Sequence, residues 1–190
     1  GDVYKRQHKE GKTNAVTGRF FRPRPSEEFY DNEVDFDNVN NLIDAPEHQE
    51  KIAELRAAMR AEMVKTYDTG LMPESMRNRR RILNKTTFYE MVRDPTLYPL
   101  EKYLDTSDIA LARKSENMPT LVEYLKDEDE CMRYWGVIGC LLLEEKAAAA
   151  KDELVKLMDD ESIEIPIFAA WALYKMGEQK VGLDQLSSIL

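Results

Sequence analysis

The sequence predicts a mainly α-helical protein, with helix–turn–helix repeats after residue 100 and a short strand, a loop and one amphipathic helix before them. Two stretches, residues 120–145 and 153–178, align with an offset of 33 positions. Composition agrees with a folded chain, since 43% of the 190 residues are hydrophobic and 33% are charged. A further apolar series has the spacing of three and four that is typical of one helix face: Ile52, Leu55, Met59 and Met63.

The charge balance restricts the classes of partner. Lys and Arg number 27 and Asp and Glu 36, which gives a net charge of −9. Such an acidic chain is not expected to bind nucleic acid, because phosphate binding needs a basic face. No apolar run reaches the length of a membrane span. Two cysteines and two histidines exclude most structural zinc sites and any disulfide framework.

Charge is also unevenly distributed along the chain. Residues 1–30 hold 7 basic and 4 acidic residues, whereas residues 121–190 hold 7 basic and 15 acidic residues, a net of −8. We therefore expect the basic start and the acidic end to belong to different structural units.

The first seven residues need a separate interpretation. The string DVYKRQ (Asp2 to Gln7) has no helical periodicity, and it resembles the translation of a transposon end used to prepare sequencing libraries. Residues 1–7 are therefore expected to be a sequencing-adapter artefact and are left out of fold reasoning. On this interpretation the natural frame resumes near His8, and the protein's true N-terminal part is missing.

A basic, punctuated segment follows, HKEGKTNAVTGRFFRPRP, in which glycines and prolines disfavour a helix. We expect it to run over a surface, with Phe20 and Phe21 as candidate anchors. One interpretation makes its cations a patch for an anionic ligand; the other makes the whole segment a solvated connecting loop. The candidate anion-binding side chains are Lys12, Arg19, Arg22 and Arg24.

The next segment predicts a strand and then a helix. Residues 27–31, EEFYD, have the aromatic content of a short strand, and an Asp/Asn-rich turn region follows. Asp44 can cap a helix that has Pro46 in its first turn and extends over residues 45–66.

Residues 8–75 resemble the closing segment of the sulfatase family, which typically reads E-L-Y-D, then D-P-x-E, then N-L and a helix. The run DTGLMPE (68–74) and the upstream lead-in are also similar to glycan-type bacterial sulfatases. Phe36 stands where the family usually has Pro, and Asn38 where Glu is common. The matching positions are Glu28, Phe29, Tyr30, Asp31, Asp35, Asn41 and Leu42.

The resemblance implies an enzyme that hydrolyses sulfate esters or sulfamates of sulfated glycans, in the periplasm or outside the cell. It also implies a missing N-terminal catalytic domain in cis, which would carry calcium and a formylglycine made from Cys or Ser in a Cys/Ser-x-Pro-x-Arg motif. Neither Cys131 nor Cys140 has that context. This chain is therefore expected to contain no catalytic residue, no metal ligand and no cofactor, and to be inactive alone.

Residues 76–99 are predicted to be a linker. Their basic cluster either contacts an acidic partner or forms a solvated helix face; its members are Arg77, Arg79, Arg80 and Arg81. Pro95 and Pro99 then precede a helix expected at about 100–113.

The repeat in residues 100–190 resembles HEAT-type helical repeats, in which a turn Asp is followed by a hydrophobic residue and Arg. Each unit is expected to be a helix, an Asp-rich turn and a second helix, with a third unit starting at 182. Pro166 is compatible only with a helix's first turn. The cysteines and both tryptophans are most simply core residues. Matched positions include Leu121 with Leu154, Asp127 with Asp160, Met132 with Ile165, Trp135 with Phe168 and Ile138 with Trp171.

Two classes of function remain open. The chain is either the C-terminal part of a sulfatase with a helical-repeat extension, or a separate repeat module that binds a protein partner on its concave face. In either case we expect residues 8–74 to be the less stable half, because a lone strand and a one-stripe helix need another packing surface.

Overall fold

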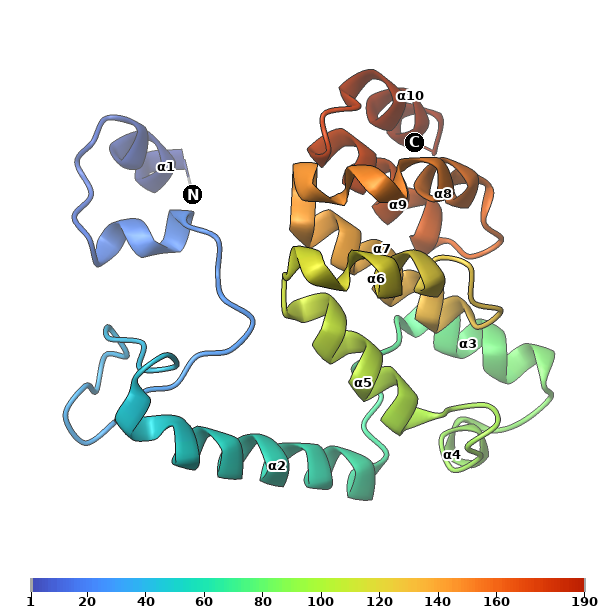
Figure 1. Ribbon diagram of the computed structural model, residues 1–190, viewed down its shortest axis with the longest axis horizontal. Coiled ribbons are helices and arrows are strands. Elements are labelled where there is room, and N and C mark those ends of the chain that lie inside the picture. The colour runs from blue at the N-terminus through green and yellow to red at the C-terminus, as the bar shows by residue number, and fades with distance from the viewer. Residues whose placement is uncertain (1, 190) are drawn as a thin grey trace. The chain divides into compact units, whose positions relative to one another are not determined.

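The computed structural model describes residues 2–189, and these residues are mainly helical, as the sequence predicts (Figure 1). They divide into two compact units, one up to Met59 and one from Arg60 onward. The first unit contains α1 (Asp2–Lys9), the 3₁₀ helices η1 (Thr17–Phe21) and η2 (Pro46–His48), and most of α2 (Gln49–Thr66). The second unit contains α3 (Glu74–Leu83), α4 (Phe88–Met91), α5 (Leu100–Leu111), η3 (Ser115–Asn117), α6 (Met118–Tyr124), α7 (Glu130–Leu143), η4 (Glu144–Ala150), α8 (Lys151–Lys156), η5 (Leu157–Asp159), α9 (Glu164–Lys175) and α10 (Gln179–Ile189).

The strand predicted at residues 27–31 is wrong. The described residues contain no strand, and this segment has no regular secondary structure. A β-strand needs a ladder of backbone partners, and this part of the chain provides only isolated bonds. The Phe29 carbonyl accepts from Leu42 N (2.7 Å), and Phe29 N donates to the Asn41 side chain (2.9 Å).

The amphipathic helix is present where it is predicted, as η2 followed by α2. Its predicted cap is wrong: Ala45 precedes η2, and no side chain caps the helix. Only part of the apolar stripe is covered, since Ile52 is buried whereas Leu55 and Met59 are exposed. The division into two units falls within this helix, immediately after Met59.

The segment expected to be a linker, residues 76–99, instead contains α3 and α4 and contributes to the core. Met76, Met91 and Tyr98 are each no more than 2% exposed. The sequence did not indicate this contribution to the core, because the apolar residues of the segment are few and lie between arginines. α4 begins with a capping box, in which Thr87 and Glu90 each accept a hydrogen bond from the other's backbone N–H.

The predicted 33-residue periodicity corresponds to paired helices, α6 with α7 and α8 with α9. The periodicity also extends back to α5, because five of the six buried residues of α5 stand 33 positions before a buried residue of α7. Tyr103 and Gly136 are one such pair. α5, α7 and α9 pack successively against one another, and α6 and α8 pack against them (Figure 1).

Small residues allow these helices to approach closely. A Cβ atom added to Gly136 would lie 3.1 Å from the backbone nitrogen of Leu125, and one added to Gly139 would lie 2.5 Å from a Leu121 methyl. Pro166 is the third residue of α9, within the first turn, as predicted.

Equivalent turns of the two repeats use equivalent hydrogen bonds. Asp127 accepts from Asp129 N, and Asp160, 33 positions later, accepts from Ser162 N. Arg133 links the turns by pairing with Asp160 at 2.8 Å while donating to the Asp127 carbonyl.

Candidate anion-binding site

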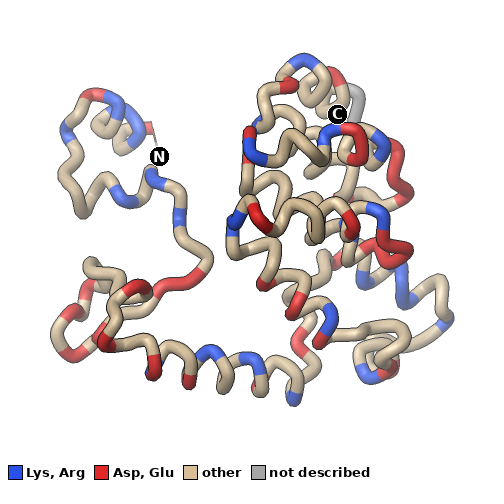
Figure 2. The backbone as a smooth tube through the Cα atoms, in the orientation of Figure 1, with Lys and Arg blue, Asp and Glu red and all other residues tan. Residues whose placement is uncertain are grey.

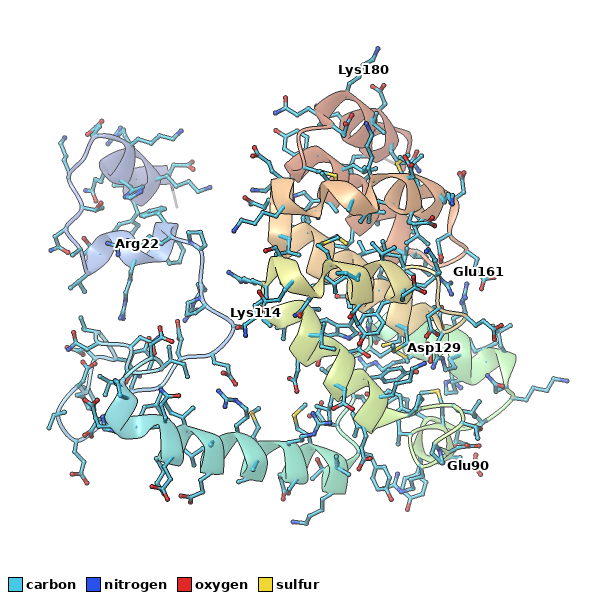
Figure 3. All side chains as sticks on the ribbon, viewed as in Figure 1. Arg22, Glu90, Lys114, Asp129, Glu161 and Lys180 are labelled. Carbon is cyan, nitrogen blue, oxygen red and sulfur yellow. The ribbon has the colours of Figure 1, made fainter. Side chains whose placement is uncertain are left out.

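A pocket of about 870 Å³ lies in the first unit, between η1 and the loop that precedes α2. Three of the four cations predicted to bind an anion line it: Arg19, Arg22 and Arg24. Arg19 projects from η1, while Arg22, labelled in Figure 3, follows that helix directly with extended backbone. Pro23 and Pro25, which also line the pocket, keep the backbone that carries Arg24 out of a helix.

The three guanidinium groups are held in different ways. Arg19 donates to the carbonyls of Asn38 and Asp37, and Arg22 Nη2 donates to the Ala15 carbonyl at 3.0 Å. Carbonyl groups are neutral acceptors, so both arginines keep their charge uncompensated by these bonds. Arg24 instead pairs with the Glu28 carboxylate at 3.0 Å.

The pocket therefore has a small positive excess. Its lining contains three arginines against the carboxylates of Glu28 and Asp37. Arginine presents several donors in one plane and suits sulfate, phosphate or carboxylate oxygens. The arrangement can hold an anionic group.

Lys12 does not belong to this site. Its ammonium pairs with Glu10 at 2.6 Å, and it is absent from the pocket lining. The proposed aromatic anchors also differ from expectation. Phe20 is 82% exposed, whereas the Phe21 ring stacks on His8 with centroids 4.2 Å apart.

The loop that forms one side of the pocket is fixed by side-chain-to-backbone hydrogen bonds. The Asn41 side chain accepts from the backbone N–H groups of Phe29 (2.9 Å) and Ile43 (3.1 Å). The Asp35 carboxylate accepts from the N–H groups of Val39 (3.0 Å) and Asn40 (2.7 Å). These backbone bonds hold the pKa of Asp35 below its usual value.

Asn38, the residue that departs from the sulfatase pattern, has a φ of 51°. Asparagine tolerates this left-handed conformation better than most residues with a side chain. The substitution is therefore compatible with the turn, and the Asn38 carbonyl is one of the two that receive Arg19.

The two cysteines offer no activated nucleophile, and the described residues form no metal cluster. Within residues 2–189, no group of three or more His, Cys, Asp or Glu side chains is placed to hold a metal ion. Both cysteines are buried free thiols. Burial raises the pKa of Cys131 well above its usual value and that of Cys140 to about 12, so neither thiol is activated.

A second polar constellation was not identified from sequence. Arg80 of α3 pairs with Asp129 at 2.6 Å, in the turn before α7, and the Tyr103 hydroxyl donates to the same carboxylate at 2.5 Å (Asp129 is labelled in Figure 3). Burial opposes ionisation of Asp129, but the hydrogen bonds from Arg80 and Tyr103 outweigh it and lower the pKa. The acidic partner of Arg80 is therefore within the chain.

Neighbouring charges extend this network to the next repeat. Arg79 pairs with Glu130 at 2.8 Å and with Glu161, in the turn before α9, at 2.9 Å. Burial nevertheless raises the pKa of Glu130, whose Oε2 lacks a well-directed hydrogen bond. We interpret the network as a structural link between α3 and the repeats, because its ion pairs join α3 to the turns before α7 and α9.

Comparison with known proteins gives no family assignment: no family model, no curated protein and no solved structure matches this chain. In the part of the chain that is described, no helix has both the length and the apolar character needed to cross a bilayer.

Proposed function

We propose that this chain is the C-terminal part of a sulfatase that acts on sulfated glycans, followed by HEAT-type helical repeats. The observation that carries the proposal is the structural role of the residues that match the sulfatase pattern. Asp35 and Asn41, which stand at matching positions of the family pattern, are the side chains that fix the loop beside the arginine pocket.

The residues downstream of that loop also support the proposal. In the run DTGLMPE, Asp68 accepts from Gly70 N (2.8 Å) and its carbonyl accepts from the Tyr98 hydroxyl (2.7 Å). Met72 is 2% exposed within the core of the second unit. Residues 68–74 of the sulfatase-like segment and the repeats thus share one core, which favours a single protein over a separate repeat module.

The role proposed for this chain is binding rather than bond cleavage. Arg19 and Arg22 would hold a sulfate group of the glycan through guanidinium hydrogen bonds. Calcium and formylglycine do not fit the residues that the structure describes, 2–189, because both cysteines are buried and no acidic cluster among these residues is placed for a metal. Both belong to the proposed catalytic domain outside this chain.

Titration of the purified chain with a sulfated disaccharide, followed by NMR, tests the binding role. We expect amide shifts confined to the pocket, weaker binding in Arg22→Glu and unchanged binding in Lys12→Glu. The same disaccharide without sulfate should leave the spectrum unchanged. If both variants weakened binding equally, the effect would come from the overall charge of the protein. That result would contradict a site at the pocket.

A further inference from the structure

Four aromatic rings form a continuous row across two repeats. Trp135 and Tyr134 of α7 have centroids 5.6 Å apart, Tyr134 and Phe168 of α9 are 5.7 Å apart, and Phe168 and Trp171 are 6.1 Å apart. We call this set the aromatic row. It lies on partly exposed positions of α7 and α9, whereas the closely packed glycines of α7 face α6.

The α7 end of the row already binds a segment of the chain itself. The Trp135 indole N–H donates to the Leu71 carbonyl at 2.8 Å, and the Cys131 thiol lies 3.6 Å from the same oxygen. Leu71 packs against the core, and Met72 beside it is buried. This contact combines an indole donor, a backbone carbonyl and large apolar side chains.

The equivalent face of α5 also receives contacts from the chain. Asp105 stands 33 positions before Ile138, which stands 33 before Trp171. Arg60 of α2 pairs with Asp105 at 2.5 Å and with Asp108 at 3.1 Å. The segment after Met59 therefore supplies contacts to this face on α5 and then on α7.

On α9 the same face is open. Trp171 is 45% exposed and Tyr174, one turn further, is 36% exposed. A large exposed aromatic side chain is well suited to the centre of an interface.

Charge near this end of the row defines the partner further. Residues 121–190 have a net charge of −8. Figure 2 shows acidic residues at the turns before α7 and α9, and Glu161 in the second of these turns keeps a 75% exposed side chain although it pairs with Arg79. Glu164 follows on α9 itself, seven positions before Trp171. A partner with Lys or Arg is therefore favoured over an acidic one.

We infer that the α9 end of the aromatic row docks a polypeptide segment from a partner protein, with a Leu or Met side chain and flanking basic residues. Its apolar side chain would pack on Trp171 and Phe168, and a backbone carbonyl would accept from the Trp171 indole as Leu71 does from Trp135. Continuity with the occupied α7 position and the acidic surroundings together select this partner. The inference does not depend on the sulfatase proposal.

Selection from a random-peptide phage library tests this inference with the full chain. The wild-type protein is the bait, and Trp171→Ala serves for counter-selection. We expect enriched peptides to combine Leu or Met with Lys or Arg. Synthetic copies should bind about tenfold more weakly to Trp171→Ala, a change typical of an interface aromatic. Binding to Tyr89→Ala should be unchanged, because Tyr89 is an exposed aromatic residue of α4 outside the row.

Two results would overturn the inference. One is enrichment of no peptide, or of peptides that bind Trp171→Ala and wild type equally. The other is a sedimentation experiment in which the wild-type protein is a dimer and Trp171→Ala is a monomer. That result would show that the aromatic row binds a second copy of this chain. Circular dichroism checks that Trp171→Ala is folded, and Tyr174→Ser provides a second variant on the same face.

Discussion

Arg80 and Asp129 join α3 to the first repeat turn through an ion pair of 2.6 Å between Nη2 and Oδ1. Their side chains are only 12% and 19% exposed. Tyr103 of α5 donates to the same carboxylate. One carboxylate therefore holds three helices, and it explains why a segment with the composition of a linker is part of the core.

Replacing Asp129 should destabilise the protein strongly. Asp129→Asn leaves the largely buried Arg80 with only Glu130, at 3.4 Å, as a charge partner, and we expect a loss of about 3 kcal/mol in the free energy of unfolding, measured by urea denaturation at neutral pH. Glu130→Gln is the matched control. Because burial already disfavours the charged form of Glu130, this variant should be close to neutral. Equal losses for the two variants would contradict this account.

The same pair predicts a pH dependence. The pKa of Asp129 is lowered in the folded state, so its contribution is complete above the unfolded value of about 4 and is lost as pH falls through the folded value. The stability difference between wild type and Asp129→Asn should therefore shrink below about pH 4. Denaturation curves across acidic pH measure it, and a difference that stays constant with pH would show that Asp129 does not act through its charge.

Gly182 is predicted to be the most sensitive glycine of the repeats. An added Cβ would lie 2.5 Å from the Ala170 carbonyl oxygen and 2.9 Å from Tyr174 Cβ. The backbone must move to accommodate this Cβ atom. Gly182→Ala should therefore lower the free energy of unfolding by about 1–3 kcal/mol and weaken the packing of α10. Gly139→Ala meets mainly the flexible end of Leu121 and should cost less. Thermal unfolding of both variants gives the order, and the reverse order would be inconsistent with this packing.

Hydrogen exchange should divide the chain near Met59 rather than after residue 74. Residues 60–76 share a core with the repeats, through Met72 and Met76, whereas the first unit contains few buried side chains. We expect slow exchange in helical parts of 60–176 and fast exchange in residues 10–45. Fast exchange throughout α3 would show that this segment is a linker after all.

Sequence periodicity predicted most of the helical architecture, because a 33-residue offset and a 3.6-residue stripe depend only on local spacing. α5, α6, α7 and α9 lie close to where this pattern places them. The role of α3 was not predictable, since Arg80 finds its partner 49 positions away. The strand at 27–31 failed because aromatic content indicates β-propensity without supplying a pairing partner.

The candidate site was predicted in part. Proline and glycine punctuation placed Arg19, Arg22 and Arg24 in one irregular segment, and the structure brings these three around one pocket. Lys12 has the same charge and lies nearby in sequence, but Glu10 holds it elsewhere. Sequence spacing alone does not distinguish an intramolecular ion pair from an open site.

The most direct test of the sulfatase proposal is to sequence the source DNA upstream of the codon for His8. The account predicts an open reading frame continuous with residues 8–190 that encodes a Cys/Ser-x-Pro-x-Arg motif and a set of Asp and Asn residues suited to calcium. A continuous frame that encodes an unrelated domain, or a start codon directly before His8, would contradict it.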